Sequence, residues 1–338
     1  MIDEQLPPID EPAIAVPASR AGSATKQSIA RAGMVVTVAF AASRVLGYLR
    51  YVVIAAAEPD PAKLDAFFAA FRIPDFLFML VAAGALSSAL IPVIAGLFAA
   101  DEEARAWRVV STVSTLVLGA LAVLSAVYLV AAPVLVPLIT PGFDEAGTAL
   151  TVELTRIMVL APLFLAAGAV ATSVLNSRGR FGAAALAPLV YNMVIILGAL
   201  LLVPTFGVAG IAIGVVLGAI GHVLVQVPTL RRLGAHIRPM ADLGDTQARR
   251  AIALMGPRAL GLGSVQVVFL VMTSLASTLG AGAISAFTFA FAMLQIPIGV
   301  IGIPLGVVLL PSLSREASLG DTGAFRRLLV RGLCLLAY

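Results

Sequence analysis

The chain has 338 residues, of which 60% are hydrophobic and 12% are charged, and its mean hydropathy is +1.05. A soluble domain carries about 25% charged residues, so this composition excludes a soluble domain and indicates a polytopic membrane protein. The formal net charge of +4 comes from arginines scattered through short connections, a distribution that excludes the single basic face of a nucleic-acid-binding protein.

Apolar segments follow one another along almost the whole chain. Residues 1–28 mix acids, prolines and small residues without the apolar run of a signal peptide, and they predict a disordered cytoplasmic tail. A helix needs about 20 apolar residues to cross a bilayer. Segments of that length lie at 33–56, 66–98, 109–138, 150–175, 183–203, 207–229, 252–279 and 283–313, and a ninth begins near Leu328 and is cut off at Tyr338. We therefore predict an all-α polytopic membrane protein with about eight complete transmembrane helices and part of a ninth.

The basic residues of the connections indicate the orientation in the membrane. Arginines or lysines occur in the tail and after every even-numbered segment, whereas the connections after odd-numbered segments contain Lys63 alone. Basic loops remain on the cytoplasmic side. The N-terminus is therefore expected in the cytoplasm, with each even-numbered segment ending there.

Two stretches of the chain resemble each other and indicate an internal repeat. Aligning Ala66 with Ala286 and Pro92 with Pro311 gives offsets of 220 and 219 residues. Six segments separate the copies, so both would have the same orientation, as in a parallel repeat about an axis along the membrane normal. We expect a six-helix N-terminal lobe at 29–240 and a partial C-terminal lobe at 241–338.

Enzyme, metal and cofactor chemistry have little support in the sequence. His222 and His236 are the only histidines, and neither has a cysteine, histidine or carboxylate three or four residues away. The single cysteine, Cys334, has no partner for an internal disulfide. We expect no catalytic residue, no metal and no cofactor.

Charged residues inside or at the ends of apolar segments are the candidate site. An arginine near the centre of a membrane helix costs about 2.5–3.5 kcal/mol on insertion scales, so it normally faces a partner, a cavity or a substrate. Arg44, Arg50 and Arg72 therefore suggest an anion site. Alternatively, the arginines reach the lipid headgroups from the helix ends, and Arg72 pairs with Asp75 three residues later. Asp65 could cap the second segment.

Prolines and glycines interrupt the second and eighth segments and are candidate hinges. The candidates are Pro74, Gly84, Pro92, Pro297, Pro304 and Pro311. Such residues free backbone carbonyls, which is tolerated in a membrane where a cavity or a neighbouring helix satisfies them. Bendable helices suit alternating access, and small residues also allow close helix packing.

Several sequence blocks resemble the MurJ/MviN family of bacterial lipid II flippases, within the superfamily of multidrug, oligosaccharidyl-lipid and polysaccharide exporters. The most specific blocks are SRVLGYLR (43–50), DAFFAAFRIP (65–74), GALSSALIPV (84–93), LNSRGRFGAAALAPLVYN (175–192) and GVVLLPSLS (306–314). The resemblance implies fourteen transmembrane helices, with two six-helix lobes around a cationic cavity and a last pair that helps form a groove for the polyprenyl tail. Arg44 and Arg50 match the arginines thought to contact the diphosphate, and Asp65 matches the acidic residue that opens the second segment.

The resemblance also implies a function. The expected activity is flipping of lipid II, a polyprenyl-diphosphate-linked saccharide, across the bacterial cytoplasmic membrane by alternating access. The expected partners are this lipid, the bilayer and possible cell-wall synthesis proteins. Two alternatives stay open: an exporter of another polyprenyl-linked saccharide or amphiphile, and a non-transporting scaffold for cell-wall synthesis.

The chain departs from the family pattern at several positions. Phe78, Met79 and Ala83 stand where the family typically has arginines and a glutamate, and Phe291 and Ala292 stand where it usually has an Asp-Arg pair. Much of the expected cationic cavity is therefore missing. The chain also stops in the expected ninth helix, which suggests either a fragment or a truncated relative.

Overall fold

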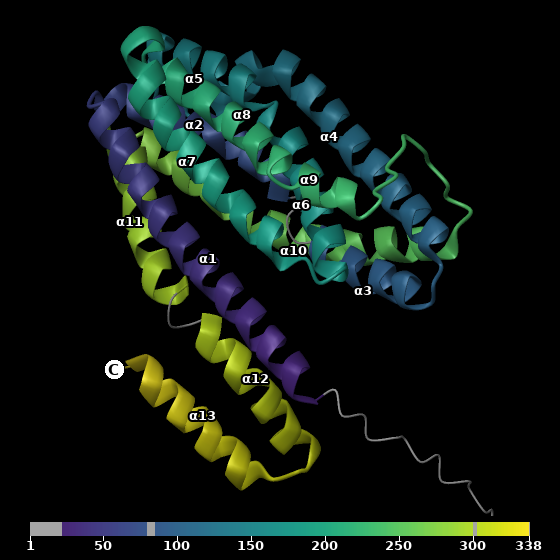
Figure 1. The fold of residues 1–338 in the computed structure, drawn as a ribbon. Helices are drawn as coiled ribbons and strands as arrows, with labels where there is room; N and C mark the ends of the chain where they lie inside the picture. The colour runs from purple at the N-terminus through teal and green to yellow at the C-terminus, as the bar shows by residue number, and fades with distance from the viewer. Residues whose placement is uncertain (1–21, 80–84, 300–302, 338) are drawn as a thin grey trace, which may run out of the picture.

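The regular structure of the protein is helical (Figure 1). The computed structural model describes residues 22–79, 85–299 and 303–337, and thirteen α-helices occupy these ranges. The helices are α1 (Gly22–Ala57), α2 (Pro61–Phe78), α3 (Ala85–Ala99), α4 (Glu103–Ile139), α5 (Glu145–Met158), α6 (Ala161–Ser177), α7 (Phe181–Phe206), α8 (Val208–Leu224), α9 (Val227–Arg232), α10 (Thr246–Ser277), α11 (Ala283–Pro297), α12 (Ile303–Ser318) and α13 (Thr322–Ala337). The predicted all-α membrane class is confirmed.

The helices follow the predicted segments closely. Five stretches of the described chain are long and apolar enough to cross a membrane: Glu103–Ile139, Glu145–Ser177, Phe181–Phe206, Val208–Arg232 and Thr246–Ser277. The predicted second segment consists of α2 and α3, and the eighth consists of α11 and α12. At the N-terminus, α1 begins at Gly22, so residues 22–28 of the expected tail are helical.

Five of the six candidate hinges lie within these four helices, α2, α3, α11 and α12. Pro74 and Pro92 lie inside α2 and α3, and Pro297 is the last residue of α11. Pro304 and Pro311 fall within α12. Gly84 and the departure at Ala83 lie outside the described residues.

Aspartates define three of the helix starts. Asp60 precedes α2, and its Oδ1 accepts hydrogen bonds from the backbone N–H groups of Ala62 and Lys63 at 3.0 and 3.4 Å. Asp144 and Asp245 cap α5 and α10 in the same way. Each carboxylate satisfies N–H groups that have no partner within the helix.

Helices α2–α11 and the later part of α1 form a bundle, and the α12–α13 hairpin stands apart from it at the C-terminal end (Figure 1). One buried apolar cluster gathers residues of α3, α4 and α6 such as Leu90, Leu121 and Val174. A second cluster joins α2, α5 and α8 through residues such as Phe67 and Leu154. The helices α1–α9 are called the N-terminal helices below, and α10–α13 the C-terminal helices.

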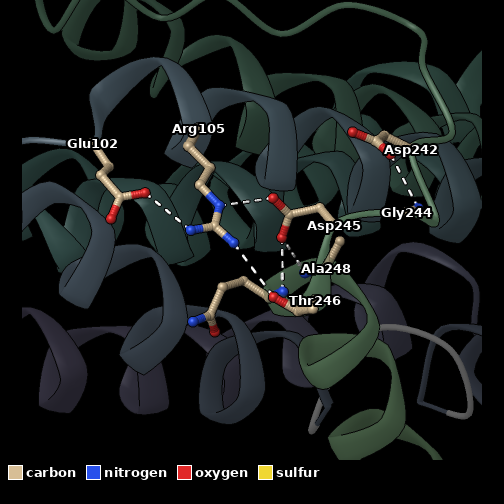
Figure 2. A network of polar contacts seen from close by, with 8 residues as sticks. Glu102, Arg105, Asp242, Gly244, Asp245, Thr246 and Ala248 are labelled. Atoms are coloured by element: carbon tan, nitrogen blue, oxygen red, sulfur yellow. Dashed lines mark hydrogen bonds and ion pairs between the residues drawn. The ribbon is translucent and has the colours of Figure 1, made fainter.

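A polar network ties the start of α10 to the start of α4 (Figure 2). Arg105 donates from Nε to Asp245 Oδ2 at 2.8 Å, and its Nη1 lies 3.0 Å from Glu102 Oε2. Hydrogen bonding from Arg105 holds the pKa of the Asp245 carboxyl below its usual value. The connection before Asp245 also lies along α4, since Asp242 N–H donates to Thr112 Oγ1 at 3.2 Å.

Candidate functional site

The candidate site is a cavity of about 470 Å³ between the N-terminal and C-terminal helices. Helices α1 and α2 line one side, and α10 and α11 line the other. Ligand pockets typically measure about 300–1,000 Å³. We call this space the inter-lobe cavity. Arg44, Arg72 and Asp75 line it together.

A second cavity, of about 480 Å³, adjoins the first inside the N-terminal helices. Helices α1, α2, α6, α7 and α8 surround it, and we call it the N-terminal cavity. Tyr51, Arg72, Asp75 and Thr288 line both spaces and so form the wall between them. Phe78, one of the departures from the family pattern, lines the N-terminal cavity only.

Arg44 lies in the inter-lobe cavity on α1. Its guanidinium packs against the end of α11, because a Cβ built on Gly299 would lie 3.3 Å from Arg44 Cζ. A glycine at this position leaves room for the guanidinium. The predicted site residue therefore faces the boundary between the two sets of helices.

Arg50 lies in the N-terminal cavity, not in the inter-lobe cavity. Its guanidinium carbon is 4.8 Å from the centre of the Tyr51 ring and 6.0 Å from that of Tyr191. Such contacts stabilise an arginine by about 0.5–2 kcal/mol. The two arginines of α1 thus line adjacent cavities, and Tyr51 lies in the wall between them.

Arg72 connects α2 to both C-terminal helices of the cavity wall. It donates from Nε to Thr273 Oγ1 at 3.1 Å and from Nη2 to Thr288 Oγ1 at 2.9 Å. Its guanidinium carbon also lies 5.3 Å from the centre of the Phe269 ring. These contacts hold the positive charge beside the cavity.

Asp75 has a partner on α10. Its Oδ2 accepts a hydrogen bond from Gln266 Nε2 at 3.2 Å. From the sequence alone, an ion pair between Arg72 and Asp75 was one alternative. Each instead makes its hydrogen bonds to residues about 190–216 positions away in the chain, which the local spacing could not reveal.

Asp65 makes a different cap from the one expected. Its side chain is 1% exposed and accepts three hydrogen bonds from the start of α11: from Gly282 N–H at 2.7 Å, Ser285 N–H at 2.7 Å and Ser285 Oγ at 2.5 Å. Asp60 caps its own helix, α2. The prediction that Asp65 caps the second segment is therefore wrong, because the carboxylate faces a helix start across the boundary.

Sequence reasoning did not identify the residues that the C-terminal helices contribute. Gln266, Thr273 and Thr288 are 8%, 0% and 7% exposed and bond to α2. Polar residues inside apolar segments were the available signal. Phe291 and Ala292 line the inter-lobe cavity where the family pattern is charged. Within the described ranges, no three His, Cys, Asp or Glu side chains gather as metal ligands would.

Comparison with known proteins gives a consistent match in sequence. A family profile described as "Lipid II flippase MurJ" matches residues 60–338. A Burkholderia cenocepacia protein named "Lipid II flippase MurJ" is 33% identical over 299 residues, which cover 86% of this chain and 58% of the relative. The chain thus spans less than two thirds of that relative's length.

Comparison with solved structures gives the fold. The structure titled "Lipid II flippase MurJ, inward closed conformation" aligns with a TM-score of 0.72 at 21% identity, covering 90% of this chain and 62% of the other. An inward-facing multidrug resistance MATE family transporter of the MOP superfamily aligns with a TM-score of 0.65 at 17% identity, covering 86% of this chain and 67% of that structure. The helical arrangement is therefore shared by both kinds of transporter.

Proposed function

The chain belongs to the family of lipid II flippases described as MurJ, and from this membership we propose that it serves to flip a polyprenyl-diphosphate-linked saccharide across the bacterial cytoplasmic membrane. The observation that carries the proposal is the pair of arginines, Arg44 and Arg72, in a cavity between two sets of membrane helices. The proposed activity is transport rather than catalysis. Cell-wall synthesis proteins are proposed partners.

We propose that the diphosphate binds between these guanidinium groups. A guanidinium makes charge-assisted, bidentate hydrogen bonds to phosphate oxygens, which an ammonium group does not match. Arg50 lies in the adjoining cavity, from which it adds positive potential. The polyprenyl tail would stay among the apolar lipid chains of the bilayer, so it would not have to enter the polar cavity.

Movement of two lobes would expose the headgroup to the other side of the membrane. We propose residues 29–240 as the N-terminal lobe and 241–338 as part of the C-terminal lobe, with a cytoplasmic N-terminus. Two sets of hydrogen bonds join the N-terminal and C-terminal helices at the end of the bundle opposite the arginine-rich connections. They are the bonds that Asp65 accepts from the start of α11 and the bond from Gly142 to Ser277. These contacts would separate when the cavity opens at that end, the outer end.

Binding of a polyprenyl diphosphate to purified protein tests the proposal. Neutralising Arg44 and Arg72 with alanine, singly and together, is expected to weaken binding at least about tenfold per arginine, since a hydrogen bond to a charged group contributes about 1.5–3 kcal/mol. The Arg50→Ala variant should weaken it less. Native mass spectrometry of the protein with the lipid gives the bound fraction.

Arg156→Ala is the matched control. Arg156 also lies on a membrane helix but donates to Leu129 C=O at 3.3 Å, away from both cavities. Its removal should leave the bound fraction unchanged. Equal binding by the wild type and the Arg44→Ala/Arg72→Ala variant would refute the proposed site.

A further inference from the structure

The two walls of the inter-lobe cavity differ in chemistry. The wall from α1 and α2 contains Arg44, Arg72 and Asp75, whereas every residue that α10 and α11 contribute to the lining is uncharged. The uncharged wall contains two aromatic rings and two amides, among them Phe291 and Gln295, beside aliphatic side chains. A headgroup that joins a diphosphate to a saccharide has the same division between a charged and an uncharged part.

Three aromatic rings stiffen the uncharged wall. The Phe269 and Phe291 rings meet edge to face, with centroids 4.7 Å apart and planes at 83°. Phe287 packs against both rings at centroid distances of 6.2 and 6.3 Å, and it does not line the cavity. Arg72 lies over the Phe269 ring. Phe291 is therefore the ring of this cluster that is left to contact a ligand.

Planar polar groups line the inter-lobe cavity together with Phe291. Gln295 lies four residues further along α11 and so shares its helix face. Asp75 and Gln266 face the same cavity and are already hydrogen-bonded to each other. A carboxyl group has two oxygens that accept hydrogen bonds, so Asp75 keeps capacity for hydroxyl groups after its bond to Gln266.

We propose that Phe291, Gln295, Gln266 and Asp75 form a saccharide subsite beside the arginines. One face of a sugar ring carries C–H groups, which stack on the electron-rich face of Phe291. The hydroxyl and amide groups at the ring edge bond to the carboxylate and the two glutamines. This assignment rests on the proposed function and names the part of its ligand that the uncharged wall recognises.

Neither a second phosphate nor a purely apolar group fits this wall as well. A second phosphate would meet no positive group on this wall, because every residue that α10 and α11 contribute to it is uncharged. An apolar group would offer no hydrogen bond to the Gln295 amide or to the remaining lone pairs of Asp75, and a buried polar group without a partner costs about 1–3 kcal/mol. A saccharide satisfies both the ring face and the polar groups.

Two probe lipids allow the saccharide subsite to be tested separately from the diphosphate site. One is a polyprenyl diphosphate without sugar, and the other is the same lipid carrying its saccharide. The wild-type protein is expected to bind the glycosylated lipid more tightly, by about tenfold. Phe291→Leu should lower this preference about three- to tenfold while leaving the affinity for the bare diphosphate lipid unchanged.

Two control variants show whether the effect is specific to the ring face of Phe291. Phe287→Leu removes a ring that contacts Phe291 and Phe269 from outside the cavity, and it should retain the preference. Phe291→Tyr keeps a ring face and should also retain it. The proposed subsite would be wrong if Phe291→Leu lowered the affinity for both lipids equally. It would also be wrong if this variant kept the full preference for the glycosylated lipid.

Binding of the two lipids by the wild-type protein distinguishes failure of the saccharide subsite from failure of the proposed function. If it bound both lipids with equal affinity, the saccharide subsite would be wrong and the diphosphate site would stand. If it bound neither lipid, the proposed function would fail and the subsite with it. Native mass spectrometry with both lipids in one titration gives the ratio directly.

Discussion

Asp65 is a buried carboxylate whose hydrogen bonds cross the boundary between the N-terminal and C-terminal helices. The Asp65→Asn variant replaces one oxygen with an NH₂ group, which cannot accept from Gly282 or Ser285. We expect it to lower the free energy of unfolding by about 1–3 kcal/mol, the cost of a buried unsatisfied donor. Denaturant unfolding of the purified protein measures the change.

Asp60→Asn is the control for this prediction. Asp60 caps α2 at an exposed position, and asparagine caps a helix about as well as aspartate. Its unfolding free energy should therefore match the wild type. Equal destabilisation by both substitutions would show that Asp65 has no special role in joining the helices.

Asp245 gives a prediction about pH. Because Arg105 lowers its pKa in the folded protein, the ionised carboxylate contributes stability above its unfolded pKa of about 3.9. That contribution is lost as the pH falls through the lower folded pKa. The stability difference between the wild type and Asp245→Asn should therefore be constant from about pH 7 to pH 5 and shrink below about pH 4.

The asparagine can retain the cap through its oxygen but removes both the charge and the acceptor for Arg105, so the comparison isolates the Arg105 contact from the cap. Thermal unfolding at pH 6 and pH 3.5 measures the difference. The effect should be small and should fall with added salt, since Arg105 is 31% exposed. A difference that persists at the lower pH would mean that the Arg105 contact does not depend on ionisation of Asp245.

At the scale of elements, α7 and α8 pack through glycines. A Cβ built on Gly198 would lie 2.6 Å from Gly214 Cα, closer than any real contact. Gly198→Ala should separate the two helices and cost about 1–3 kcal/mol, as overpacked cores do. Gly119→Ala on α4 is the matched control, because nothing lies within 4 Å of a Cβ there.

Gly119→Ala should be neutral or stabilising by up to about 1 kcal/mol, since alanine favours a helix over glycine. Unfolding of the two variants in the same detergent gives the comparison. If Gly198→Ala were as stable as Gly119→Ala, close packing would not hold α7 against α8.

The elements were largely predictable from hydropathy, whereas the partners of their polar residues were not. Apolar runs located the helices, whereas Pro74 and Pro92, expected as hinges, lie inside α2 and α3. The glycines at 210, 214 and 218 were a packing signal that the segment pattern alone did not use. The contacts of Arg72 and Asp65 join residues more than 200 positions apart, and no local periodicity specifies such a pair.

At the scale of the whole molecule, one contact joins two residues that the proposed repeat would make equivalent. The offset of 220 residues that aligns Ala66 with Ala286 also aligns Asp65 with Ser285, and these two residues are hydrogen-bonded. Equivalent elements of two copies meet where they approach the axis that relates them. A parallel repeat would place α2 and α11 near its axis, at the end of the bundle where these two residues meet.

We propose that closure of this end, the proposed outer end, also depends on Gly142, in the connection between α4 and α5. Its N–H donates to Ser277 Oγ at 3.2 Å, and a Cβ built on it would lie 2.1 Å from Ser277 C=O. Alanine at this position cannot fit unless α10 moves away. We therefore expect Gly142→Ala to open the outer end, while Gly119→Ala leaves it closed.

A cysteine in the cavity reports this opening. Ala292 lines the inter-lobe cavity, so Ala292→Cys in a Cys334→Ser background places one thiol there. A membrane-impermeant maleimide added from the outer side should label it several-fold faster when Gly142 is alanine. The proposed flipping requires the lobes to separate at this end so that the lipid can leave. If Gly142→Ala left the labelling rate unchanged, the Gly142–Ser277 contact would not close the cavity.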